Sequence, residues 1–92
     1  MEGLKSQMKI KEDSSVIKST KIYFKGHIPY RYVLRYLPKE LPKFPYAAHR
    51  ENMVLINDIW EPSVRYWASL KTSLEAAEKE YQNKIDSEGV MG

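Results

Sequence analysis

Basic side chains and tyrosines are interleaved along the first half of the chain, and their types and spacing suit one specific chemistry. Arg31 and Arg35 are four positions apart, and each is followed by a tyrosine, Tyr32 or Tyr36. Cations neutralise phosphates and release counterions, and aromatic rings stack on unpaired bases. The pattern therefore suits single-stranded DNA or RNA better than the duplex major groove, for which the sequence carries no recognition motif. The predicted nucleic-acid-binding residues are Lys18, Lys21, Lys25, Arg31, Tyr32, Arg35, Tyr36, Lys39 and Lys43.

The charge of the chain is unevenly distributed. Over 92 residues the net charge is +3, but residues 1–50 hold 11 Lys and Arg against 4 Asp and Glu, a balance of +7. Residues 51–92 hold 4 against 8, a balance of −4. The basic half coincides with the tyrosine-rich segment, which favours an anionic partner. The alternative is that Arg31 and Arg35 pair with acids of the C-terminal helix, such as Glu75, Glu78 or Glu80, and serve as internal scaffolding.

Residues for catalysis or cofactor binding are sparse. The chain has no Cys, and its four Gly are scattered, so it offers no thiolate ligand, no cysteine nucleophile and no Gly-rich phosphate loop. His27 and His49 do not have metal-ligand spacing, and nothing in the sequence brings them together with Glu51. We therefore expect a non-enzymatic protein with no cofactor and no metal.

A stripe of large residues in the C-terminal part is a second candidate surface. Trp60, Trp67, Leu74 and Tyr81 recur every seven residues, and Leu70 lies between them. This spacing is typical of a helix that packs against another helix, and Trp is frequent at the centre of protein interfaces. The alternative function is therefore a protein-interaction module, an accessory subunit or inhibitor that docks on a larger complex through this Trp-bearing helix. A homodimer through the same helix is a further possibility.

The N-terminal elements are expected to be an arm and a strand. Residues 1–15 carry few apolar groups and no aromatic side chain, which predicts a flexible arm. Residues 16–25 are rich in β-branched and aromatic types and end at Gly26, which predicts a β-strand.

The middle of the chain is expected to hold a short basic helix and a connector. Pro29 suits the first turn of a helix, and apolar residues at helical spacing from Tyr30 predict a helix that ends before Pro38. Three prolines make 37–46 an extended connector.

The last part of the chain leaves one element open. Residues 46–60 are compatible with a helix, or with a strand at 52–57 that pairs with the first strand, and we slightly favour the strand. Residues 62–86 contain no Gly and carry the stripe, which predicts a long amphipathic helix.

These elements predict a small α+β protein. Residues 16–92 would form a single small domain with one or two short strands, a short basic helix and a long C-terminal amphipathic helix, and a mostly-α fold is the alternative. The longest apolar run, Met53–Ile56, is far shorter than the roughly 20 residues of a membrane span. The first dozen residues lack the apolar stretch of a secretory signal. From the short apolar run and the lack of a signal stretch, we expect a cytoplasmic protein with no membrane partner.

Overall fold

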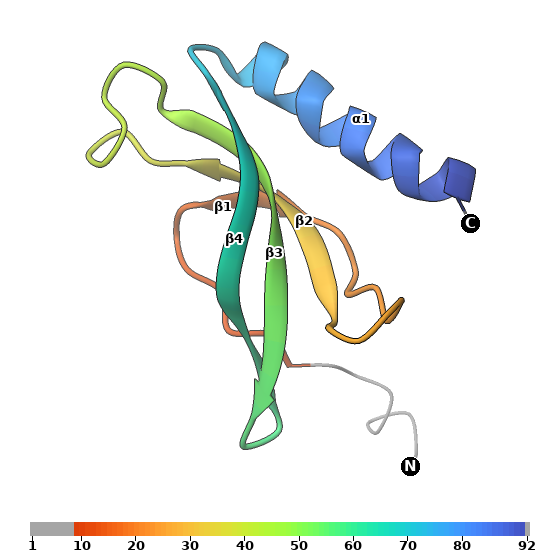
Figure 1. The fold of residues 1–92 in the computed structure, drawn as a ribbon. Coiled ribbons are helices and arrows are strands. Elements are labelled where there is room, and N and C mark those ends of the chain that lie inside the picture. Colours follow the sequence, from red (N-terminus) through yellow and green to blue (C-terminus); the bar gives the residue numbers. More distant parts are fainter. Residues whose placement is uncertain (1–8, 92) are drawn as a thin grey trace.

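The computed structural model describes residues 9–91, with the side chains of all of these except 67, 68 and 89–91. Four strands form one antiparallel sheet in the order β1-β2-β3-β4, and a helix follows. Figure 1 shows α1 lying across one end of the sheet, while the hairpin of β3 and β4 extends well beyond the helix. The elements are β1 (Val16–Ser19), β2 (Tyr30–Tyr36), β3 (Tyr46–Ile56), β4 (Ile59–Lys71) and α1 (Leu74–Met91).

The fold class differs from the sequence prediction. The chain is mostly antiparallel sheet with a single C-terminal helix, so the predictions of one or two short strands, of a short basic helix and of a mostly-α alternative are wrong. In the part of the chain that the structure describes, no helix is long and apolar enough to cross a membrane.

The predicted helix over 30–37 is strand β2. Tyr30, Tyr32 and Leu34 face α1, whereas Arg31 and Arg35 lie on the other face of the sheet, and all five are buried. A strand that is covered on both faces shows no simple apolar-polar alternation, so the helical spacing of its apolar residues was misleading. Pairing with β1 on one side and β3 on the other gives β2 its backbone hydrogen bonds.

The predicted helix over 62–86 is wrong in its first part, which is strand β4. The register of β4 against β3 shifts twice, between Ala48 and Arg50 and between Glu51 and Met53. Each shift interrupts the alternation of side chains along the strand, so no two-residue period appears in the sequence. The helix begins only after Ser73, whose hydroxyl accepts a hydrogen bond of 3.2 Å from the amide of Ala76.

The open element at residues 46–60 is a strand followed by a tight turn. Strand β3 is longer than the favoured 52–57, because it runs from Tyr46 to Ile56. Asn57 and Asp58 then have φ values of 51° and 68°, which is the left-handed pair of a two-residue hairpin turn. The extended connector was predicted over 37–46; residues 37–45 form a loop with turns between β2 and β3, and Tyr46 already belongs to β3.

Residues 9–15, here called the N-terminal strap, connect the two ends of the sheet. The amide of Lys11 donates to the carbonyl of Trp60 and the amide of Trp60 donates to the carbonyl of Lys9, both at 2.8 Å. At the other end, the carbonyl of Ser15 accepts from the amide of Tyr36 at 2.8 Å. Residues 1–8 of the predicted flexible arm lie outside the described residues, but the strap itself is fixed at both ends.

Candidate functional site

Arg31 and Arg35, the centre of the predicted nucleic-acid surface, are buried at 0% and 1% exposure. Both guanidinium groups bind Glu51, at 2.7 and 2.9 Å, on the face of the sheet opposite the helix. The strap supplies the remaining carboxylates, because Glu12 accepts from Arg31 at 2.9 Å and Asp13 accepts from Arg35 at 2.8 Å. The alternative of internal pairing therefore describes these two arginines, although their partners lie on β3 and the strap and not on the helix.

His49 completes this buried charge network. Its Nε2 accepts a hydrogen bond of 3.1 Å from Nε of Arg35, so this nitrogen carries no proton. Its Nδ1 lies 3.3 Å from the carbonyl of Arg50, which fits a neutral ring that donates there. Burial lowers the pKa of His49 below its ordinary value of 6.5. The network is thus built for a neutral imidazole beside two arginines.

The other predicted nucleic-acid-binding residues are divided between the two faces and the loops. Tyr32 is buried on the helix side, where its hydroxyl donates to Glu88 at 2.9 Å. Lys18 pairs with Glu78 at 3.0 Å, and Lys25 pairs with Glu88 at 3.2 Å. The remaining residues of the set are exposed, namely Lys21, Tyr36, Lys39 and Lys43. The nine residues therefore do not form one surface.

The predicted protein-interface stripe is not one helix face. Trp60 and Leu70 belong to β4, and the side chain of Trp67 lies outside the described residues. Leu74 starts the helix and is partly exposed, whereas Tyr81 is buried in the core against the sheet. The seven-residue spacing crosses from a strand into a helix and has no common geometry.

Sequence reasoning missed an apolar cluster at the end of the β3–β4 hairpin. The hairpin tip consists of Val54, Leu55, Ile56 and Ile59, whose exposed fractions lie between 38% and 51%. Val54, Ile56 and Ile59 share one face of the hairpin, and Leu55 is on the other face. Figure 1 shows that this end of the hairpin lies far from α1, which covers only the other end of the sheet. The signal in the sequence is an apolar run followed by Asn57-Asp58, a pair that tolerates the left-handed turn.

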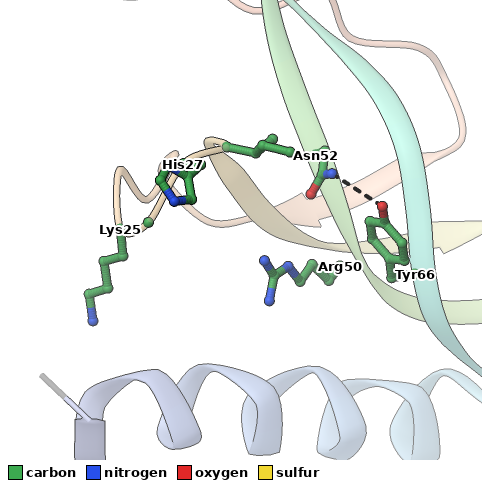
Figure 2. A pocket seen from close by; sticks show the side chains of 7 residues that line it. Lys25, His27, Arg50, Asn52 and Tyr66 are labelled. Atoms are coloured by element: carbon green, nitrogen blue, oxygen red, sulfur yellow. Dashed lines mark hydrogen bonds between the residues drawn. The ribbon is translucent and has the colours of Figure 1, made fainter.

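A pocket of about 430 Å³ opens between the β1–β2 loop and strands β3 and β4. Its lining residues are Lys25, Gly26, His27, Ile28, Arg50, Asn52 and Tyr66. We call it the Arg50 pocket, because the side chain of Arg50 extends into it with the guanidinium 3.9 Å from the ring centre of Tyr30 (Figure 2). Only Lys25 of this set was singled out from the sequence, because the pocket is assembled from segments that are far apart along the chain.

Glu88 of α1 closes the helix side of this region. It accepts hydrogen bonds from the hydroxyls of Tyr30 at 2.7 Å and Tyr32 at 2.9 Å, and from Lys25. Burial opposes the charge of this carboxylate, but these three donors outweigh it and lower the pKa of Glu88. Burial and the same carboxylate raise the pKa of Tyr30 to about 12. Glu88 is therefore ionised at neutral pH and already occupied by protein donors.

The structure does not assemble a metal site from the histidines. His49 and Glu51 lie on one face of β3, whereas His27 is in the loop that lines the Arg50 pocket. Within residues 9–91, no group of three His, Asp or Glu side chains is placed to hold a metal ion.

Comparison with protein-family models, with curated proteins and with solved structures finds no match to this chain.

Proposed function

We propose that the protein is a non-enzymatic docking module that binds a partner protein through its hairpin tip. The observation that carries this proposal is the set of four exposed aliphatic side chains at the end of the hairpin, three of which share one face. Single exposed apolar residues are ordinary, but contiguous apolar patches on a small protein mark interaction sites. The partner is expected to offer an apolar cleft of matching width.

The construction of the tip supports this proposal. The turn residues Asn57 and Asp58 lie directly between Ile56 and Ile59, which are paired across the two strands. The strands are therefore paired as far as the turn itself. A preformed hairpin loses little conformational entropy when it docks. A small protein has few apolar residues for its core. Four of them are exposed at the tip, where they contribute little to that core, so a role in binding explains them better than a role in folding.

The test is affinity purification with a double variant, Leu55→Ser with Ile56→Ser. Its matched control is Val64→Ser with Leu70→Ser, which removes two exposed apolar residues from β4. We expect the tip variant to lose a protein that the wild type and the control retain. The purified partner should bind the wild type at least tenfold more tightly than it binds the tip variant. Nuclease treatment of the lysate must leave the complex intact. Equal recovery with the tip variant, when circular dichroism shows it folded, would contradict the proposal.

Binding of single-stranded nucleic acid is our second proposal, and the loop after β2 supports it. Tyr36 is exposed and stacks on Tyr46 with ring centres 4.9 Å apart; Lys39 lines a hollow together with Tyr36, and Lys43 is exposed further along the same loop. An exposed ring beside cations is a stacking platform for a base. Binding of a short oligonucleotide at about 50 mM salt should be lost in the variant Lys39→Glu with Lys43→Glu. Unchanged binding in that variant would remove this loop from consideration.

A further inference from the structure

Two polar atoms in the Arg50 pocket are buried without a hydrogen-bond partner among the described residues. They are Nε of Arg50 and Oδ1 of Asn52, a residue that is only 7% exposed. Figure 2 shows Oδ1 on the side of Asn52 that faces away from Tyr66, toward the space around Arg50. Buried polar groups in folded proteins nearly always find a partner, so an orphaned donor and acceptor on two residues that line one pocket point to a bound molecule that reaches them.

The orientation of the Asn52 amide does not change this conclusion. Nδ2 of Asn52 donates a long hydrogen bond of 3.5 Å to the hydroxyl of Tyr66. If the two ends of the amide are exchanged, the hydroxyl donates to Oδ1 and the Nδ2 group is left without a partner. One end of the amide faces the pocket unpaired in either case.

The charge of the pocket favours an anion. Among the described residues no carboxylate lies within ion-pair distance of Arg50, in contrast to Arg31 and Arg35. The stacking of Arg50 on Tyr30 fixes the plane of the guanidinium, and its two Nη groups have no ion-pair partner among the described residues. Lys25 is a second cation of the pocket lining. It pairs with Glu88 at 3.2 Å, and the same carboxylate also accepts hydrogen bonds from the hydroxyls of Tyr30 and Tyr32.

The size and lining of the pocket indicate more than a bare phosphate ion. Pockets for small organic ligands commonly measure roughly 300–1,000 Å³, and this one measures about 430 Å³. The planar fork of an arginine matches the oxygens of a phosphate. On the other side, the Asn52 amide and the exposed ring of Tyr66 suit the edge and the face of a planar polar group.

We propose that the Arg50 pocket binds a nucleoside monophosphate, with the phosphate on Arg50 and Lys25, the edge of the base on the Asn52 amide and its face on the ring of Tyr66. The hairpin tip continues beyond this site on the same strands, with Val54 two positions after Asn52, but the residues that the tip variant changes, Leu55 and Ile56, do not line the pocket. The tip variant described above therefore keeps the ligand, and failure of one proposal leaves the other standing.

The test is a titration of the ¹⁵N-labelled full chain with each of the four ribonucleoside 5′-monophosphates, followed by NMR and calorimetry. Inorganic phosphate and adenosine are the partial probes. We expect at least one monophosphate to shift the side-chain signals of Arg50 and Asn52 in a saturable manner, and to bind at least tenfold more tightly than either partial probe. Shifts that adenosine alone reproduces, or no shift with any monophosphate at millimolar concentration, would overturn the proposal. So would binding of a short oligodeoxythymidine at these residues in the absence of monophosphate binding.

The variants Arg50→Gln and Arg65→Gln form a matched pair, because Arg65 is an exposed arginine on β4 outside this pocket. Arg50→Gln should weaken the monophosphate at least tenfold, and Arg65→Gln should leave its affinity unchanged. If Arg50→Gln does not fold, Lys25→Gln and Tyr66→Ala alter partly exposed side chains and replace it. Equal affinity in all of the folded variants would contradict the assignment.

Discussion

Among the described residues, Glu51 is the one whose side chain pairs with both buried arginines, and it is itself fully buried. Replacing it with Gln removes the only buried negative charge of the network and leaves Arg31 and Arg35 dependent on the half-exposed Glu12 and Asp13. Breaking a buried pair in this way typically costs about 3–5 kcal/mol of unfolding free energy. We expect Glu51→Gln to lose stability in this range, measured by urea denaturation.

The control for that prediction is Glu78→Gln. Glu78 pairs with Lys18 at 3.0 Å on the surface, where an ion pair contributes about 0–1 kcal/mol. Similar losses in the two variants would show that burial of the network does not determine its contribution.

His49 makes the stability of the fold depend on pH near neutrality. Its pKa is lowered in the folded protein, so the unfolded chain binds the proton more readily. Its contribution is therefore present above the ordinary value of 6.5 and is lost as the pH falls below it. We expect the unfolding free energy to decrease from about pH 7 to about pH 5.

The variant His49→Gln should flatten this slope, because a Gln oxygen can accept from Arg35 without titrating. His27→Gln, at an exposed position, should keep it. The pKa of Asp13 is lowered from 3.8 to about 2, and the pKa of Glu88 is lowered from its ordinary value of 4.5. The contributions of these two carboxylates are therefore lost only at a lower pH than that of His49. Denaturation of each variant at a series of pH values measures this slope. An unchanged slope in His49→Gln would exclude His49 as its source.

The residue types of this network were visible in the sequence, but their arrangement was not. Arg is rarely buried, so the spacing of Arg31 and Arg35 was interpreted as surface chemistry. Their partners lie 16 to 22 positions away in the chain, at Glu51, Glu12 and Asp13. Only the pairing of β2 with β3 and the path of the strap bring these carboxylates to the arginines.

At the level of elements, the sequence predicted correctly where local signals and burial agree. The strand predicted over 16–25 is present only as β1 at Val16–Ser19, the strand favoured over 52–57 is part of β3, and the helix predicted over 62–86 is present only from Leu74. Strand β2 could not be separated from a helix because both of its faces are buried. Strand β4 could not be recognised because its two register shifts interrupt the alternation. The Arg50 pocket and the hairpin tip exist only once these two strands are in place.

The hairpin turn offers a prediction about its own stability. Asp58 adopts a φ of 68°, a conformation that is strained for most residues and free for Gly. Because Asn-Gly is the favoured pair for this turn, Asp58→Gly should raise the unfolding free energy by about 0.5–1 kcal/mol. Asp58→Val should lower it, because β-branched residues fit this conformation poorly. Thermal unfolding measures both, and a change of the same sign in the two variants would contradict the argument.

For the molecule as a whole, the strap ties β4 to β2 across the face that holds the buried charge network. The variant Glu12→Gln with Asp13→Asn keeps the shape of the strap but removes its ion pairs. We expect faster hydrogen exchange at the amides of Lys11, Tyr36 and Trp60, which bond to or from the strap, because local opening requires only that the strap detach. Amides in the centre of β3 should keep their protection. Equal acceleration throughout the sheet would mean that the strap and the sheet open together.

The outer edge of the sheet determines how copies of this protein behave at high concentration. Strand β4 is the last strand of the sheet, and beyond its short pairing with the strap no further strand of the described residues pairs with its outer edge. A flat edge of this length would invite other copies to add strands and grow into fibrils. Here Pro62 lacks an amide donor, the two register shifts bend the strand, and Arg65 places a charge along it. The same irregularities that hid β4 from sequence prediction therefore protect the chain against polymerisation.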